Sequence, residues 1–230
     1  MRKRILWVYD VLFRADILLL MGVLLIIGGT WAFVQVLEEV NEGDTEAFDR
    51  WAIASVEHLP HSPSLAQMGA DVTALGGVAV LTLFTAAVIG HLLISHKYHA
   101  LVLLLVAVGG GVVLTFALKG YIDRDRPEAS LHKTHVMTKS FPSGHAMLST
   151  VVYLTLGTLL ARLTSDRRLK FYYIAVAILL SGLIGLSRVY LRVHWPTDVL
   201  AGWSAGLVWA IGCWVVARWL QHRGKVEQPR

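Results

Sequence analysis

The sequence predicts an all-α membrane protein in which six transmembrane helices form a bundle, preceded by an amphipathic helix at the N-terminus. Of the 230 residues, 55% are hydrophobic and only 16% are charged, which is too apolar for an ordinary soluble domain. The apolar residues gather into six runs of about 20 residues, the length that a helix needs to cross the hydrocarbon core. We find neither an internal repeat nor a low-complexity linker, so residues 1–230 are predicted to form one domain.

The N-terminal segment, residues 1–14, carries four basic residues among large apolar ones. This pattern is typical of a helix that lies on an anionic membrane surface. A cleaved signal peptide is the alternative. Against it, Asp10, Arg14 and Asp16 interrupt the approach to the next apolar run, and that run is long enough to span the membrane. We therefore expect an uncleaved first span over residues 17–36.

The remaining spans follow an acidic segment, residues 37–67, whose second half has the apolar spacing of a short interfacial helix. We expect the later spans over residues 70–95, 100–118, 143–163, 171–186 and 197–220. Gly76 and Gly77 fall within the second span. Three consecutive glycines, residues 109–111, would let a neighbouring helix approach the third span closely.

The distribution of basic residues predicts the orientation of the chain. Six spans place both termini on one side, and thirteen of the 21 Lys and Arg residues fall there. The positive-inside rule assigns that side to the cytoplasm. Seven of the other eight lie in the two outer loops after the third and fifth spans, where the rule expects few. We interpret this outer cluster as a binding site for an anion.

The loop before the last span carries Arg188, His194 and Asp198. If the chain is helical after Pro196, Asp198 lies in the first turn and its carboxylate can reach back to the His194 ring. That contact would fix the tautomer and leave the other ring nitrogen free to attack. Arg188 would supply a planar cation suited to phosphate oxygens. The alternative is a set of interfacial residues that only anchors a helix.

A second segment, residues 142–145, is typical of a helix start, with Ser143 as a possible N-cap. Free backbone N–H groups and the helix dipole favour a bound phosphate there. His145, in the first turn, would lie beside that anion as a proton donor. Lys119 and Arg126, from the loop after the third span, would add positive charge.

Each of these residues also has a purely structural explanation. Lys119 would simply extend to water from a helix end, and Arg126 would pair with Asp123 or Asp125. Residues 143–144 would be only a turn, with His145 as a polar cap. These separate explanations would have to place three cations, two histidines and a helix start on one face by coincidence. We therefore favour a common site.

The complete pattern resembles the three-part signature of the type 2 phosphatidic acid phosphatases (PAP2). That superfamily also includes bacterial acid phosphatases and vanadium haloperoxidases. The three parts are Lys119-x6-Arg126-Pro127, then Pro-Ser-Gly-His at residues 142–145, then Ser187-Arg188-x5-His194-x3-Asp198. All are present and in order, which is far more specific than one short motif. The six-span layout also resembles the membrane branch of the superfamily.

The resemblance implies a phosphatase without a metal or another cofactor. His194 would attack phosphorus and form a phosphohistidine, with Asp198 orienting its ring. His145 would protonate the leaving oxygen and then activate the water that hydrolyses the intermediate. The residues implied to hold the phosphoryl oxygens are Lys119, Arg126, Ser143, Gly144 and Arg188.

The implied substrate is a lipid phosphate or diphosphate at the outer face of a bacterial plasma membrane. Undecaprenyl diphosphate, phosphatidic acid and phosphatidylglycerol phosphate all fit. The alternative is an anion or lipid-phosphate transporter or binding protein that does not hydrolyse its ligand. It would explain the cations, but it gives no reason for a His194–Asp198 pair opposite a second histidine.

Other features of the sequence receive no functional role. No stripe of Lys and Arg with interleaved aromatics indicates nucleic-acid binding. Cys213 is the only cysteine, so a disulfide within the chain is excluded. His132 and His135 would lack a third metal ligand, and Asp71 is left unexplained.

Overall fold

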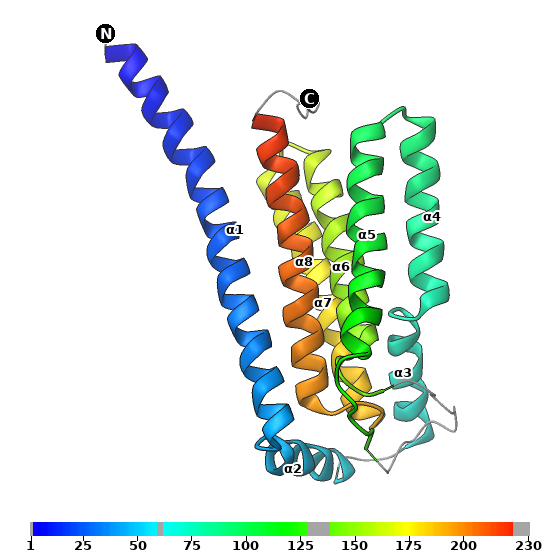
Figure 1. Cartoon of the computed structure of the whole chain (residues 1–230). Helices are drawn as coiled ribbons and strands as arrows, with labels where there is room; N and C mark the ends of the chain where they lie inside the picture. The colour runs from blue at the N-terminus through cyan, green and yellow to red at the C-terminus, as the bar shows by residue number, and fades with distance from the viewer. Residues whose placement is uncertain (1, 59–61, 128–138, 223–230) are drawn as a thin grey trace.

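The computed structural model describes residues 2–58, 62–127 and 139–222, with side chains from residue 17 onward (Figure 1). This part of the chain consists of helices and the loops that join them. The eight helices are α1 (Arg2–Glu42), α2 (Glu46–Glu57), α3 (Pro63–Ala74), α4 (Val78–Ile94), α5 (Tyr98–Lys119), α6 (Gly144–Arg162), α7 (Arg167–Tyr190) and α8 (Pro196–His222).

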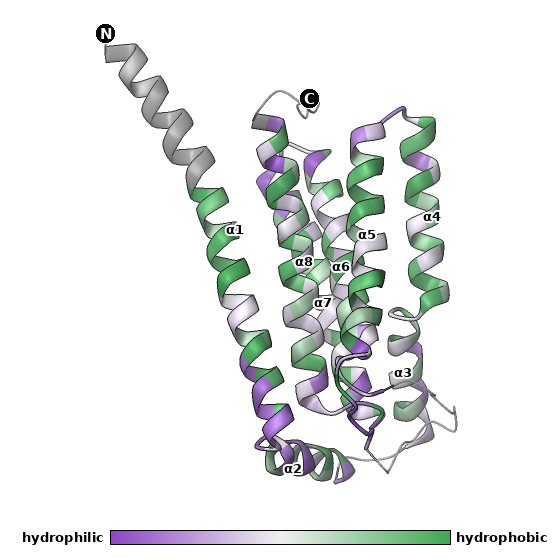
Figure 2. Cartoon of the chain, in the orientation of Figure 1, coloured by the Kyte–Doolittle hydropathy of each residue, from purple (hydrophilic) through white to green (hydrophobic). Residues whose placement is uncertain are grey.

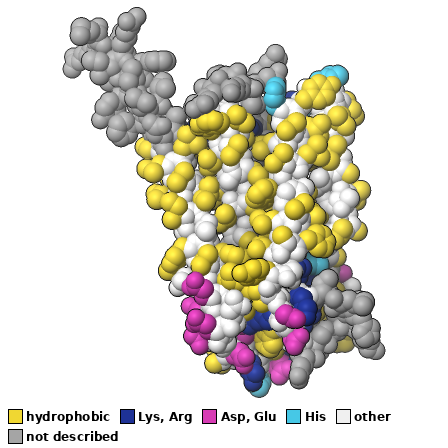
Figure 3. Space-filling model, viewed as in Figure 1, with side chains coloured by type: hydrophobic (Ala, Val, Ile, Leu, Met, Phe, Trp, Pro, Cys, Tyr) yellow, Lys and Arg dark blue, Asp and Glu magenta, His cyan; other side chains and the backbone are white. Residues whose placement is uncertain are grey.

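The spans predicted from the apolar runs are present. In the described residues, α5, α6, α7, α8 and the part of α1 from Ile17 are each long and apolar enough to cross a membrane. The pair α3 and α4 forms a sixth span if the two bent helices count as one. Hydrophobic residues follow the middle of the helices, and hydrophilic residues lie toward their ends (Figure 2). On the face seen in Figure 3, hydrophobic side chains cover the lateral surface, and acidic and basic side chains gather at one end. We call this the α2 end, since α2 and α3 lie there (Figure 1).

Helix α1 is longer than predicted. Residues 1–14 were expected as a surface helix; from residue 2 they are helical and run into the first span without a break, giving one helix of 41 residues. Their position on the membrane surface stays a prediction. The predicted end at residue 36 is wrong, because the helix continues to Glu42. Residues 37–42 are mostly Glu, Leu and Val, which do not interrupt a helix as Gly or Pro would. The short interfacial helix is confirmed as α2.

The second span is not the continuous helix predicted over residues 70–95. It begins earlier, at Pro63, where the Ser62 side chain caps the helix by accepting a hydrogen bond from Leu65 N. It then breaks between α3 and α4, which are bent by 40°. A Cβ on Gly76 would lie only 2.4 Å from the side chain of Ile184, so glycine permits this close approach to α7.

Helix α6 is the centre of the bundle, packed against α5, α7 and α8. Half of the residues in its most apolar stretch are buried, a larger share than in α1, α5, α7 or α8. Helix α8 approaches it closely: a Cβ on Gly202 would lie 2.7 Å from the Ser143 carbonyl oxygen, and one on Gly206 would lie 2.7 Å from that of Met147. The start of α6 and the first turns of α8 are therefore held together at the α2 end.

A small apolar cluster supports the loops at the α2 end. Ile122, from the segment after α5, and Phe141, from the segment before α6, pack with Ala201 of α8. Four side chains of α1 complete the cluster: Phe33, Val36, Leu37 and Val40. The rings of Phe33 and Phe141 are 6.2 Å apart. Both loops therefore rest on α1.

Candidate active site

The structure brings all eight predicted site residues to the α2 end. Lys119 is the last residue of α5, and Arg126 lies in the segment that follows it. Ser143 and Gly144 start α6, and His145 lies in its first turn. Arg188 lies in the last turn of α7, His194 between α7 and α8, and Asp198 in the first turn of α8. Three segments that are distant in sequence therefore meet at one end of the bundle.

His194 and Asp198 face each other as predicted, and both are buried, with 2% and 0% of their surfaces exposed. Helix α8 begins at Pro196, and Nδ1 of His194 lies 3.4 Å from Oδ2 of Asp198, which is long for a hydrogen bond. The same oxygen accepts hydrogen bonds from Trp195 N, at 2.9 Å, and from the Ser140 hydroxyl. An Nδ1–H directed at this carboxylate leaves Nε2 without a proton.

Burial lowers the pKa of His194 to about 4, although Asp198 raises it in the opposite direction. The imidazole is therefore neutral at physiological pH. Its Nε2 lies 3.2 Å from Nη1 of Arg126. That guanidinium nitrogen donates to the Val193 carbonyl over 2.7 Å, so it is fixed beside the ring. The unprotonated nitrogen of His194 thus contacts a cation, which would stabilise the negative charge of an incoming phosphoryl group.

The sequence did not reveal the roles of Arg124, which is partly buried and contacts Asp198, or of Asp49, which is buried and contacts Arg124. Arg124 donates to Asp198 Oδ1 over 2.7 Å and to Asp49 Oδ2 over 2.6 Å. Asp49, on α2, is 1% exposed and also accepts from the Thr197 backbone N–H and hydroxyl, at 3.2 and 2.6 Å. The Arg124 guanidinium further lies 5.7 Å from the centre of the Trp195 ring. This network ties α2 to the first turn of α8.

The sequence held one signal for Asp49. It shares a face of α2 with Ile53, the other buried residue of that helix, four positions later. A carboxylate on the buried face of an amphipathic helix needs a partner. The many other acidic residues of the segment hid this signal.

Lys119 and Arg126 are held through the segment before α6. Lys119 Nζ donates to the Lys139 carbonyl over 2.9 Å, and Arg126 Nη2 reaches the same oxygen at 3.4 Å. The Lys139 side chain itself pairs with Asp123. Burial lowers the pKa of Arg126, with Asp198 acting in the opposite direction. The two cations thus converge on one stretch of backbone.

The start of α6 differs in detail from the prediction. Ser143 occupies the N-cap position, but its side chain makes no capping hydrogen bond. Its backbone N–H donates to the Asp198 carbonyl over 2.9 Å and is therefore not available to a phosphate. Its hydroxyl is buried and has no hydrogen-bond partner in the described structure. A Cβ on Gly144 would lie 3.3 Å from Cε of Lys119, so this start of α6 lies close against the lysine side chain.

Arg188 and His145 complete the site. Arg188 Nη1 donates to Thr73 Oγ1 of α3 over 3.0 Å, whereas its Nε is buried without a partner in the described part of the chain. His145 lies close enough to interact electrostatically with Lys119, Arg126, Arg188 and His194. Buried polar atoms usually have a partner, yet the Ser143 hydroxyl and Arg188 Nε have none among the described residues.

The remaining candidates lie elsewhere. Asp71 is exposed on α3 and accepts a hydrogen bond from Gln67 over 2.8 Å, so it is not part of the site. His132 and His135 fall outside the described residues. Among the residues within them, no three His, Cys, Asp or Glu side chains gather in a group that could hold a metal ion.

Comparison with known proteins gives consistent relatives. The model of the family described as the PAP2 superfamily matches residues 100–222. Phosphatidylglycerophosphatase B of Bacillus subtilis (strain 168) is 33% identical over 159 residues, which cover 68% of this chain and 77% of that protein. An undecaprenyl-diphosphatase of Sulfolobus acidocaldarius is 42% identical over 67 residues, only 29% of this chain and 28% of its own length.

Two solved structures share the fold. The crystal structure of a transmembrane PAP2 type phosphatidylglycerolphosphate phosphatase from Bacillus subtilis has a TM-score of 0.72 and 27% identity, and covers 91% of this chain and 98% of that one. Aquifex aeolicus LpxE has a TM-score of 0.54 and 24% identity, and covers 70% of this chain and 92% of that one.

Proposed function

The chain belongs to the PAP2 superfamily, and on this premise we propose that it hydrolyses a lipid phosphate or diphosphate through a phosphohistidine intermediate. The observation that carries the mechanism is the His194 ring: Nδ1 faces Asp198, while Nε2 faces the Arg126 guanidinium. One nitrogen is oriented by a carboxylate, and the other is available beside positive charge. This is the arrangement that an imidazole nucleophile needs.

In the first step, the lone pair of His194 Nε2 attacks phosphorus and the bond from phosphorus to the leaving oxygen breaks. His145 gives its proton to that oxygen, which leaves as a lipid alcohol or, from a diphosphate, as a lipid monophosphate. Substrate binding favours the protonated form of His145 because it brings negative charge beside the ring. Charge on the transferring group is spread over its equatorial oxygens, where Lys119, Arg126 and Arg188 stabilise it.

In the second step, neutral His145 takes a proton from water, and the resulting nucleophile attacks the phosphohistidine. The phosphorus–nitrogen bond breaks, His194 is restored, and inorganic phosphate leaves. Asp198 holds the His194 ring in one tautomer through both steps. The orphaned Ser143 hydroxyl and Arg188 Nε support a phosphoryl group as the missing ligand, since both are donors that its oxygens would satisfy.

Phosphatidylglycerol phosphate is the first substrate to test, because the relative matched over most of its length is a phosphatidylglycerophosphatase. Undecaprenyl diphosphate and phosphatidic acid are the other candidates. The test uses purified protein in detergent with EDTA, and measures phosphate release from each lipid. We expect release to persist under chelation and to fall by roughly four orders of magnitude in His194→Ala. His58→Ala removes an exposed histidine at the same end of the bundle and serves as the control.

Radiolabelled substrate distinguishes hydrolysis from mere binding. During turnover, the wild-type chain should carry an acid-labile, base-stable phosphoryl group that His194→Ala lacks. Tight lipid binding without phosphate release would instead support a transporter or binding protein. Release that depends on added divalent metal, or that survives in His194→Ala, would contradict the mechanism.

A further inference from the structure

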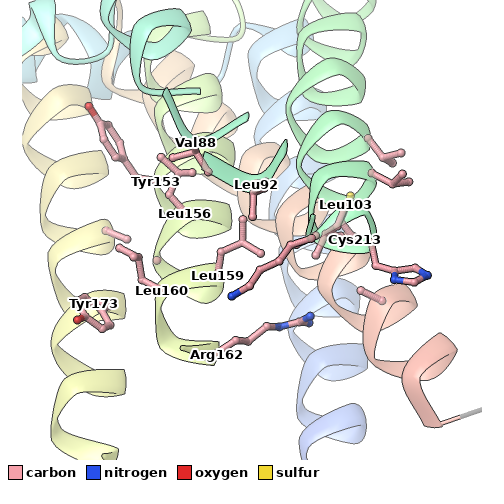
Figure 4. Close-up of a pocket in the computed structure, with 18 of the residues that line it drawn as sticks. Val88, Leu92, Leu103, Tyr153, Leu156, Leu159, Leu160, Arg162, Tyr173 and Cys213 are labelled. Atoms are coloured by element: carbon pink, nitrogen blue, oxygen red, sulfur yellow. The ribbon is translucent and has the colours of Figure 1, made fainter. Parts of the chain in front are cut away.

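A large apolar cavity lies in the half of the bundle opposite the candidate active site (Figure 4). Its volume is about 2030 Å³, and it is bounded by α4, α5, α6, α7 and α8, with Ile26 of α1 also in the lining. Drug-sized ligands occupy pockets of about 300–1,000 Å³, so this cavity is large enough for a long chain. None of the eight predicted site residues lines it. Its occupant is therefore a separate question from the reaction.

The length of the cavity matches one leaflet of a membrane. On α6 its lining extends from Tyr153 to Arg162, which is about 14 Å along the helix axis. Half of the hydrocarbon core of a bilayer is about 15 Å. Leu156, Leu159 and Leu160 line the stretch between those two residues (Figure 4). A single acyl chain from the leaflet at this end would fill that length.

The far end of the cavity carries positive charge that no carboxylate of the described residues neutralises. The Arg162 side chain extends into the cavity (Figure 4) and has no hydrogen bond or ion pair in the described structure. Arg218 lies close enough to repel it electrostatically, and Arg218 Nε is buried without a partner among the described residues. Two like charges near an apolar cavity are costly unless an anion lies between them.

The described part of the protein offers no such anion. At the cavity end of α4 to α8, and in the turns that join these helices there, the one described carboxylate is Asp166. Asp166 caps α7 and accepts from the Arg168 backbone N–H over 2.8 Å. A ligand that suits this cavity would carry negative charge and be attached to an apolar chain. A phospholipid headgroup provides both, and guanidinium groups bind phosphate through paired hydrogen bonds.

We propose that the cavity binds an anionic phospholipid from the leaflet opposite the candidate active site. One acyl chain lies between α4 and α6, and the phosphate lies between Arg162 and Arg218. The site would fix α4, which packs mainly against α5, to the rest of the bundle. This proposal does not depend on the phosphatase reaction.

The test measures lipid binding to the full-length chain in nonionic detergent by native mass spectrometry. Phosphatidylglycerol and phosphatidylcholine with identical acyl chains differ in headgroup charge alone. We expect one phosphatidylglycerol to bind about tenfold more tightly than phosphatidylcholine, and Arg162→Gln to remove this preference. Arg168→Gln changes an exposed arginine at the same end and should leave it intact. Equal binding of the two lipids, or an unchanged preference in Arg162→Gln, would overturn the proposal.

A second variant tests the apolar part of the site. Gly212 lines the cavity, and a Cβ there would have no atom within 4 Å, so Gly212→Leu should fill the space without a clash. Gly109 is equally open but does not line the cavity, which makes Gly109→Leu the matched control. We expect about tenfold weaker phosphatidylglycerol binding in Gly212→Leu alone. Equal effects of the two variants would contradict an acyl chain in the cavity.

Two further outcomes would assign the cavity differently. Inorganic phosphate that displaced phosphatidylglycerol at equal concentration would show that the acyl chain contributes nothing. Displacement by an uncharged polyprenol would instead show that the cavity binds the apolar chain of a substrate from the other leaflet. Phosphatase activity should persist in every variant, because Arg162 lies about 25 Å along α6 from His145. Loss of activity without loss of lipid binding would bear on the proposed function and not on this site.

Discussion

Arg124 donates to Asp198 over 2.7 Å, and through this contact the carboxylate that faces the His194 ring is tied to α2. Asp198 is therefore not held by its own helix alone. Its two oxygens accept hydrogen bonds from three different segments, through Arg124, Ser140 and Trp195. Asp49 accepts a hydrogen bond from the other terminal nitrogen, Nη2, of the same guanidinium. The position of the proposed nucleophile thus depends on a residue far from the family signature.

Asp49→Asn tests this dependence. The substitution keeps the shape of the side chain but removes the charge that pairs with Arg124. Breaking a buried ion pair from one side costs about 3 kcal/mol, so we expect a clearly lower temperature of thermal unfolding in detergent. We also expect kcat to fall about tenfold, with KM little changed, because Asp198 loses its support. Asp44→Asn alters an exposed carboxylate just before α2 and should do neither. An unchanged kcat would show that the network is only structural.

The pH dependence of the reaction should report the buried His194. Its pKa is lowered to about 4 by burial, and the nucleophile must be neutral. We therefore expect protonation of His194 to lower kcat/KM near pH 4, well below the ordinary histidine pKa of about 6.5. An acid limb near 6.5 that shifts on substitution of Asp198 would contradict this assignment.

The same shift affects stability, with a defined sign. The unfolded chain binds a proton at His194 below about pH 6.5, whereas the folded chain does so only below about 4. Stability from this group is therefore fully present above about 6.5 and is lost as pH falls toward 4. As pH falls across that window, the unfolding temperature of the wild type should fall more steeply than that of His194→Gln. Parallel curves would argue against the lowered pKa.

Ser143→Ala separates binding from folding. The hydroxyl has no partner in the described structure, and the backbone N–H, which bonds to the Asp198 carbonyl, is unaffected by the substitution. We expect the unfolding temperature to stay the same or rise slightly, and kcat/KM to fall about tenfold through loss of one charge-assisted hydrogen bond. Ser149→Ala, at a buried serine further along α6, is the control. Unimpaired kcat/KM would remove Ser143 from the proposed phosphate site.

Gly202→Ala should disturb the site through the packing of α6 against α8. Its Cβ would lie 2.7 Å from the Ser143 carbonyl oxygen, and the backbone cannot move aside as a side chain can. Overpacking of this kind costs about 1–3 kcal/mol, and separation of the two helices would also stretch the bond from Ser143 N to the Asp198 carbonyl. We expect a lower unfolding temperature and much lower activity. Gly212→Ala, in open space, should preserve both.

The orientation of the chain stays a prediction that reporter fusions can test. The excess of basic residues on the side of the termini predicts a cytoplasmic C-terminus and an active site on the outer face. A fusion after residue 230 should therefore be active with a cytoplasmic reporter and silent with a periplasmic one. The reverse pattern would overturn the proposed location of the reaction.

The sequence predicted most of the fold because hydrocarbon thickness imposes long apolar runs, which are easy to recognise. It missed the break near Gly76, because a glycine pair in an apolar run is compatible with a straight helix until Ile184 is known to lie against it. The eight predicted site residues were selected because they belong to one three-part signature, and the structure places all of them at the α2 end. Asp49 and Arg124 were missed because their importance comes from contact with each other and with Asp198, across a long separation in sequence.

The cluster of Ile122, Phe141 and Ala201 has a consequence for how small a functional fragment can be. The family model matches residues 100–222, yet that segment is supported by contacts with the helices that precede it. Phe141 packs on Phe33 of α1, Arg124 pairs with Asp49 of α2, and Arg188 donates to Thr73 of α3. A truncation to residues 100–222 would keep every signature residue and lose all three of these supports. We therefore expect the smallest active fragment to include the first two spans, although they carry none of the signature.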